Sequence, residues 1–257
     1  MSGFAESLSI IAPAFTAGVI VLMSHVPLGR EVVRRGIIFI DLAIAQMAGF
    51  GIILAGTLGM EAEGWPLQAV AFGSAITAAL VIGLLERFAG EFQEALIGIC
   101  FVLAATASLL LLASNPHGGE HLADLLSGQI LWVRWEQLWL PAVVSLAILT
   151  LWLWRRPLLQ GRLFYLFFAI AITQSVQLIG VYLVFSSLVM PALATARLAD
   201  KPALVAALLI GTAAYAGGLL LSLPTDLPSG ALIVWTLLIG AVVGVISCRP
   251  FVTNPGR

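Results

Sequence analysis

Long apolar runs alternate with short polar breaks along most of this chain. The runs that lie between charged residues or proline and glycine breaks predict helices at residues 8–24, 37–56, 67–85, 95–113, 138–154, 203–222 and 231–247. A helix needs about 20 apolar residues to cross a bilayer, and most of these runs reach or approach that length. The pattern therefore predicts an all-α, polytopic membrane protein.

One further apolar run, at 163–190, is too long for a single ordinary helix. It holds 28 residues without a charged side chain, which exceeds one crossing and falls short of two full ones. We expect two short helices or one broken helix here. The total is then eight or nine transmembrane helices.

The basic residues predict the orientation, because cytoplasmic loops retain Arg and Lys. If the arginines after the first run are cytoplasmic, alternation of the helices puts nearly all other basic residues on the same side. That set comprises Arg30, Arg34, Arg35, Arg87, Arg155, Arg156, Arg162, Arg197, Lys201, Arg249 and Arg257, and excludes Arg134. The agreement requires 163–190 to cross an even number of times. It favours nine helices, an external N-terminus and a cytoplasmic C-terminus.

Composition excludes several classes of protein. Of the 257 residues, 61% are hydrophobic and 10% are charged, against about 25% charged in a soluble domain. No linker divides the chain, so we expect a single membrane domain over 1–257, surrounded by lipid. The net charge of -1, with no basic cluster, gives no reason to expect nucleic acid as a partner. Cys100 and Cys248 lie far apart within apolar runs and are interpreted as packing residues.

Three tryptophans lie shortly before the fifth predicted span. In LLSGQILWVRWEQLW, at 125–139, Trp132, Trp135 and Trp139 are three and four residues apart, which would place them on one helical face. This spacing predicts an interfacial helix anchored by its indoles. The alternative is that the segment is only the start of the next span.

Asp41 is the most informative ionisable residue. It enters the second apolar run and is followed by a long uncharged stretch. A carboxylate within a membrane helix costs at least about 2.5 kcal/mol, so such residues commonly line a transport path or find a partner. Asp41 therefore either lines a path or pairs with Arg34 or Arg35 at the membrane surface.

Three glutamines add polar groups to apolar helices. Gln46, Gln174 and Gln177 can line a transport path, and they can equally hydrogen-bond one helix to another. His25, near the end of the first run, is interpreted as an interface residue rather than a ligand.

The predicted external loops are acidic and hold two of the three histidines. His117, Glu120 and His121 match the H-x-x-E-H pattern of one class of zinc peptidase, but the neighbouring Asn-Pro and Gly-Gly pairs oppose the helix that this pattern requires. Imidazole and carboxylate together suit zinc and similar ions. The loop is therefore either a loose metal-collecting site or a solvated loop with incidental histidines.

The sequence has no P-loop. Such a loop ends in Gly-Lys-Ser/Thr, whereas the single lysine, Lys201, follows Asp200. We therefore expect a non-catalytic subunit. If ATP drives transport, the ATPase is a separate polypeptide that docks on the cytoplasmic side.

Three stretches carry a family resemblance: RGIIFIDLAIAQ at 35–46, VQLIG through LVMPALATARL at 176–198, and DLPSGALIV at 226–234. They resemble the permease subunits of the zinc/manganese/iron ABC importer family. The first looks like the family's second helix with its entering aspartate. The second is the most specific, and is similar to a pore helix that runs into the segment docking on the ATPase. The third resembles the last external turn.

The resemblance implies a homodimer in the bacterial inner (plasma) membrane, with two ATP-binding subunits and an external metal-binding protein. It implies ATP-driven alternating access, with a divalent metal as substrate and no permanently bound cofactor. The residues that would transmit ATPase closure are Pro191, Ala192, Ala194, Thr195 and Arg197. Pro191 is expected to end its helix, and 192–199 to form a short amphipathic coupling helix.

The chain departs from this family at one informative position. Many members place a histidine four residues after the aspartate, whereas this chain has Ala45, followed by Gln46. Either the transported metal passes a site formed by Asp41 and weaker ligands, or the substrate differs from that of the typical family member. Zinc is the first choice because of the external histidines, and manganese or ferrous iron the second.

Two other functions remain open at this stage. A secondary transporter would usually have two repeated halves with broken helices, and 163–190 has no evident counterpart in the first half. An intramembrane enzyme would need convergent catalytic groups within the helices, and beyond Asp41 the sequence has no such constellation.

Overall fold

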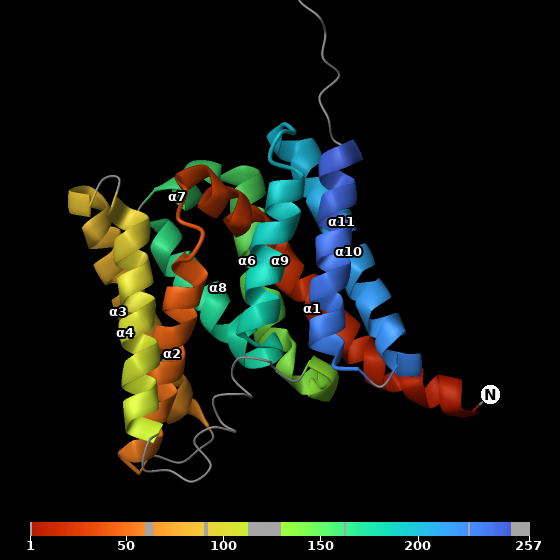
Figure 1. The fold of residues 1–257 in the computed structure, drawn as a ribbon, viewed down its shortest axis with the longest axis horizontal. Helices are drawn as coiled ribbons and strands as arrows, with labels where there is room; N and C mark the ends of the chain where they lie inside the picture. The colour runs from red at the N-terminus through yellow and green to blue at the C-terminus, as the bar shows by residue number, and fades with distance from the viewer. Residues whose placement is uncertain are drawn as a thin grey trace, which may run out of the picture.

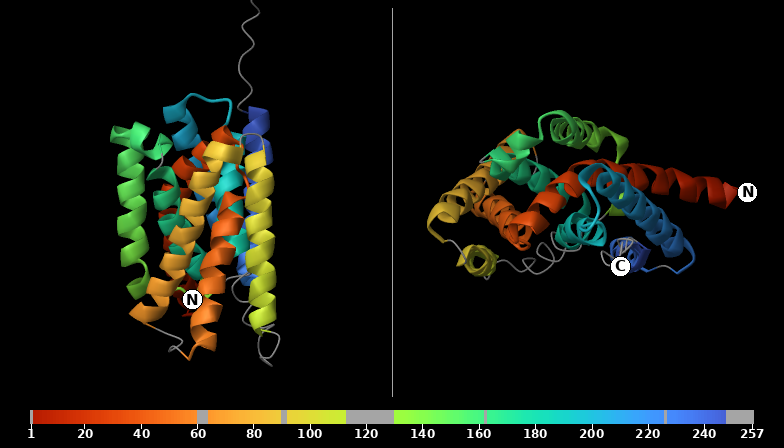
Figure 2. Two further views of the ribbon diagram at one scale, coloured as in Figure 1. Left: turned by 90° about the vertical axis from the view of Figure 1, so that its left-hand side faces the viewer. Right: turned by 90° about the horizontal axis from the view of Figure 1, so that it is seen from above.

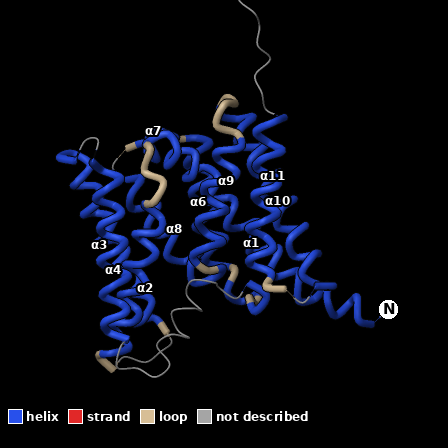
Figure 3. The backbone as a smooth tube through the Cα atoms, in the orientation of Figure 1, coloured by secondary structure: helices blue, strands red, loops and turns tan. Residues whose placement is uncertain are grey.

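The computed structural model describes residues 2–59, 64–89, 92–112, 130–161, 163–225 and 227–247. All regular structure within these residues is helical (Figure 3). The α-helices are α1 (Ser2–Arg35), α2 (Ile40–Thr57), α3 (Trp65–Ala89), α4 (Gln93–Leu112), α6 (Trp139–Trp154), α7 (Arg156–Gln160), α8 (Leu163–Ile179), α9 (Val181–Ala194), α10 (Asp200–Thr225) and α11 (Ser229–Ser247). Two 3-10 turns, η2 (Ile130–Trp132) and η3 (Trp135–Gln137), precede α6.

The predicted all-α, polytopic architecture is confirmed. Helices α1, α2, α3, α4, α10 and α11 are long and apolar enough to cross a membrane, and three shorter apolar helices, α6, α8 and α9, accompany them. The helices form one elongated bundle, with α2, α3 and α4 at one end and α10 and α11 at the other (Figures 1 and 2). Helix α1 contacts α6, α8, α9 and α10, so it organises the centre of the bundle.

The run at 163–190 breaks into two short helices, as expected from its length. Gly180 separates α8 from α9 with φ 81° and ψ 162°, a conformation that is essentially restricted to glycine. Arg156, shortly before α8, forms an ion pair with Asp200, shortly after α9. The two helices therefore run in opposite directions and return the chain to the face from which it came (Figure 1).

The expected coupling helix over 192–199 is wrong. Pro191 lies inside α9, which continues to Ala194, and the residues from Thr195 to Ala199 form turns. A proline removes only one backbone donor, and the hydroxyl of Thr195 binds the carbonyl oxygen of Pro191 at 2.9 Å. Because α10 already begins at Asp200, no room remains for a separate helix. We call Thr195–Ala199 the 195–199 turn.

The prediction of a single interfacial helix around the tryptophans is wrong for the residues from 130 onward, which are the part of that segment that the structure describes. The turns η2 and η3 are separated by non-helical residues, and the extended Arg134 receives a side-chain cap from Gln137. The side chains of Trp132, Trp135 and Trp139 are nevertheless 78%, 56% and 61% exposed. Exposed indoles at the start of an apolar helix are typical of the lipid–water boundary.

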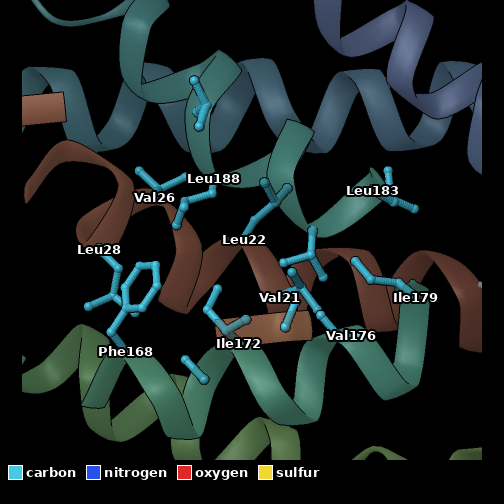
Figure 4. Close-up of a cluster of buried hydrophobic side chains, with 14 of the residues drawn as sticks. Val21, Leu22, Val26, Leu28, Phe168, Ile172, Val176, Ile179, Leu183 and Leu188 are labelled. Carbon is cyan, nitrogen blue, oxygen red and sulfur yellow. The ribbon is translucent and has the colours of Figure 1, made fainter. Parts of the chain in front are cut away.

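The core lies where α1 packs against α8 and α9. Figure 4 shows Val21 of α1 beside Ile172 and Val176 of α8, whereas Leu22 and Val26 lie on the side of α9, near Leu188. By contrast, α3, α4, α10 and α11 expose many large apolar side chains. In a multi-pass membrane protein these faces meet lipid or a partner.

Candidate functional site

Asp41 lies in the first turn of α2 and is buried within the protein. It is 1% exposed, and neither carboxylate oxygen has a hydrogen-bond partner among the described residues. Arg34 binds Glu31 and Asp200, and Arg35 binds Glu31. Asp41 therefore does not pair with Arg34 or Arg35. Within the described part of the chain, Asp41 is left as a buried acidic group without a basic partner.

Glu94 is a second acidic group at this site that the sequence analysis missed. It lies in the first turn of α4, where its Oε1 accepts a hydrogen bond from the backbone N–H of Phe39 at 3.1 Å. Its other oxygen is buried and has no partner within the described ranges, and the bond to Phe39 places Glu94 at the start of α2, the helix that carries Asp41. The sequence signal was the same as for Asp41, an acidic residue that opens a long apolar run.

A cavity of about 550 Å³ opens between α2, α4, α9 and α11. Its lining residues are Leu42, Gln46, Phe101, Ala105, Val181, Tyr182, Phe185, Ser186, Ala231, Val234 and Trp235. Gln46 contributes an amide to this largely apolar wall. Leu42, which follows Asp41 in the first turn of α2, is also part of this lining.

The other two glutamines lie away from the cavity lining. Gln174, on α8, is buried with neither amide atom hydrogen-bonded, while Gln177 on the same helix is exposed. Of the four expected path residues, the structure therefore brings Gln46 to the cavity, while Asp41 lies on the same helix but is not part of the lining. It does not gather Gln174 and Gln177 with them.

The five expected ATPase-coupling residues lie at the end of α9 and in the 195–199 turn. Pro191, Ala192 and Ala194 are buried, and Thr195 is fully buried with its hydroxyl bound to the end of α9. Arg197 is exposed. Only Arg197 of this set presents an accessible side chain, while the other four hold the end of α9 against its neighbours.

The expected external metal-collecting residues, His117, Glu120 and His121, lie outside the described residues. Within the described ranges no three His, Cys, Asp or Glu side chains form a group suited to a metal ion. His25 is fully buried in α1, where Nδ1 hydrogen-bonds the carbonyl of Val21 at 3.0 Å, so its interpretation as an interface residue is wrong. Cys100 is a free, half-buried thiol, as expected.

Known proteins with similar sequences and folds agree with this architecture. The chain is 25% identical over 249 residues to the manganese transport system membrane protein MntC of Halalkalibacterium halodurans, covering 89% of this chain and 84% of that one. Its fold is similar to that of a chain in the solved structure of PsaBC from Streptococcus pneumoniae in complex with Fab. The TM-score is 0.69 at 18% identity, over 95% of this chain and 94% of that chain.

The family assignment rests on a match across nearly the whole sequence. The family described as the ABC 3 transport family matches residues 7–162 and 157–248. Those two stretches contain all three segments on which the sequence resemblance rested. The chain therefore belongs to the ABC 3 transport family.

Proposed function

We propose that this chain is the membrane-spanning permease subunit of an ATP-driven importer for a divalent metal ion. Membership of the ABC 3 transport family and the likeness to a manganese transport system membrane protein support the transporter class. The observation that carries the metal is Asp41, which is buried and has no basic partner among the residues that the structure describes. A buried carboxylate without compensation is costly, and a passing cation would supply the missing charge.

Asp41 and Glu94 form the polar part of the proposed path. The free oxygen of Glu94 and both oxygens of Asp41 are buried without hydrogen-bond partners, so three acceptors are available to an ion that is shedding water. Gln46 adds an amide oxygen at the neighbouring cavity. Glu94 thus takes the place of the histidine that is absent at Ala45, as a ligand from a different helix.

The donor chemistry favours manganese over zinc. Asp41, Glu94 and Gln46 offer oxygen ligands, which suit Mn²⁺, whereas imidazole and thiolate favour Zn²⁺. The argument for zinc rested on His117 and His121, in the predicted external loop. We therefore propose Mn²⁺ as the first substrate to test, with Zn²⁺ and Fe²⁺ beside it.

The proposed assembly contains two copies of this chain. Trp235 and Tyr182, on the wall of the cavity between α2, α4, α9 and α11, are more than half exposed. A second copy facing this wall would enclose a path between the two permeases. Two separate ATP-binding subunits would contact the 195–199 turn and Arg197, and an external metal-binding protein would deliver ions to the opposite face.

In this arrangement, residues 1–257 form one permease domain in the bacterial inner membrane. The N-terminus is external and the C-terminus cytoplasmic. Closure of the ATPase pair would move the 195–199 turn and with it α9, which lines the cavity. The path would then open alternately to the two sides, as expected for ATP-driven alternating access.

Uptake into proteoliposomes tests this function. The chain is reconstituted with its candidate ATPase, and uptake of Mn²⁺, Zn²⁺ and Fe²⁺ is measured with and without ATP. Asp41→Asn is compared with Glu136→Gln, a control that removes an exposed carboxylate from η3. The proposal expects ATP-dependent uptake that Asp41→Asn abolishes and the control retains. Metal uptake that needs no ATP would favour a secondary transporter, and no uptake of any metal would refute the substrate class.

A further inference from the structure

Asp200 is the centre of an ion-pair network that neither the path nor the ATPase contact yet explains. Its Oδ1 accepts hydrogen bonds from Arg30 at 3.1 Å, from Arg34 at 3.2 Å and from Arg156 at 2.9 Å, and its Oδ2 pairs with Arg156. Arg30 and Arg34 come from the end of α1, and Arg156 comes from α7. One carboxylate at the start of α10 thus connects three elements that are far apart in the sequence.

Arg30 also holds the other end of the 195–199 turn. While one guanidinium nitrogen binds Asp200, the other donates to the backbone carbonyl of Thr195 at 3.2 Å. The turn begins at Thr195 and ends at the residue before Asp200, so a single arginine spans it. The side chain of Arg30 is only 7% exposed, which reduces screening by solvent.

Helix α1 is in turn fixed to its neighbours near this network. Gly29 packs against the backbone of α9 at Leu188, and Arg35 binds the backbone carbonyls of Gln160 and Gly161 after α7. The guanidinium of Arg35 also lies 4.4 Å above the ring of Phe164 at the start of α8. A displacement of the turn is therefore passed through Arg30 to α1, and from α1 to α8 and α9.

We infer that Asp200 is a positioning residue that locks the 195–199 turn to α1 and α7, so that movement of the turn moves the helices around the path. The inference rests on the proposed ATPase contact at this turn. Asp200 touches no substrate and acts through its arginines. An isolated exposed ion pair contributes little, and the side chain of Asp200 is 41% exposed. Three arginines on one carboxylate form a network, in which the contributions of ion pairs are larger.

The first test needs neither metal nor ATPase. Hydrogen exchange by mass spectrometry is measured on the full-length chain in lipid nanodiscs, as wild type, Asp200→Asn and Lys201→Gln. Lys201 is the exposed neighbour of Asp200 and provides the matched control. The turn amides of Ala196 and Leu198 are hydrogen-bonded to Leu193 and Thr195, so they report its opening.

Loss of the charged acceptor is expected to raise exchange in the turn about tenfold in Asp200→Asn, with α8 protected as in wild type. The control should exchange as wild type. If Asp200→Asn does not fold, Arg156→Gln removes one arginine from the α7 side and is expected to raise exchange in the same turn. Wild-type exchange in a folded Asp200→Asn or Arg156→Gln variant would overturn the inference.

The second test measures coupling in the assembled transporter. The number of ATP molecules hydrolysed per metal ion taken up is expected to rise several-fold in Asp200→Asn, while the ATPase still co-purifies with the permease. Residues in one network show non-additive effects. The double variant Arg156→Gln, Asp200→Asn should therefore hydrolyse the same number of ATP molecules per metal ion as Asp200→Asn alone. An unchanged ratio, or strictly additive effects, would overturn the inference. A wild-type complex that moves no metal would refute the proposed function instead, and would leave the exchange result intact.

Discussion

The α-carbon of Gly29 on α1 packs directly against the backbone carbonyl of Leu188 on α9. A methyl group at position 29 would lie 2.0 Å from that carbonyl oxygen, and 3.4 Å from the methyl group of Ala192. Small residues permit such close helix contacts inside membranes, where packing rather than the hydrophobic effect drives helix association. This contact joins the central helix α1 to α9, one of the helices that line the cavity.

Gly29→Ala should therefore destabilise the protein. The added methyl group meets backbone rather than a flexible side chain, so α1 and α9 must separate, at a cost of about 1–3 kcal/mol. Thermal unfolding of the purified protein in detergent measures this. Gly73→Ala on α3, where a methyl group would meet nothing within 4 Å, is the matched control and should unfold at or above the wild-type temperature. Equal unfolding temperatures for Gly29→Ala and wild type would contradict the contact.

Gly180→Ala should weaken the break between α8 and α9. The backbone at Gly180 has φ 81° and ψ 162°, and a side chain in this region costs about 1–3 kcal/mol. Gly161→Ala is the control, because Gly161 has φ -90° and an added methyl group would make only ordinary contacts. A lower unfolding temperature for Gly180→Ala alone is expected. The same temperature for both variants would mean that the chain turns here without the glycine-specific backbone.

Asp41→Asn should make the metal-free protein more stable while it abolishes transport. The change keeps the shape of the side chain and removes an ionisable carboxyl group that is buried with no hydrogen-bond partner for its oxygens among the described residues. Isolated buried charges are unfavourable, so the unfolding temperature in the presence of a chelator should rise. Gln46→Glu, which adds a carboxylate on the same helix at the cavity wall, should lower it. A fall in stability for Asp41→Asn would indicate a hidden basic partner for Asp41.

The hydrophobic pattern predicted the spans well, because lipid imposes the length of each apolar run on the sequence itself. A break within 163–190 followed from the same argument, since 28 uncharged residues fit neither one nor two full crossings, but its place at Gly180 did not. The position at which α9 ends could not be predicted from this pattern. Pro191 is a helix breaker in isolation, but α9 continues past it to Ala194, and the hydroxyl of Thr195 then satisfies the carbonyl of Pro191 in the last turn.

The candidate site was predictable only in part. Asp41 stood out because an acidic residue opens an apolar run, but the same signal at Glu94 was not distinguished from an ordinary charge at a helix end. Their proximity depends on the packing of α2 against α4, which no local pattern encodes. The network around Asp200 could not be predicted from the sequence for a similar reason, because Arg30, Arg156 and Asp200 meet only in the folded chain.

Equilibrium binding of Mn²⁺ to the purified permease tests the central claim most directly, with free Mn²⁺ measured by electron paramagnetic resonance. Wild type and Glu136→Gln should bind the ion, whereas Asp41→Asn and Glu94→Gln should each lose at least about tenfold in affinity, a loss that even supporting groups around a metal can cause. Binding by both carboxylate variants as tight as that of wild type would contradict a metal path through Asp41 and Glu94.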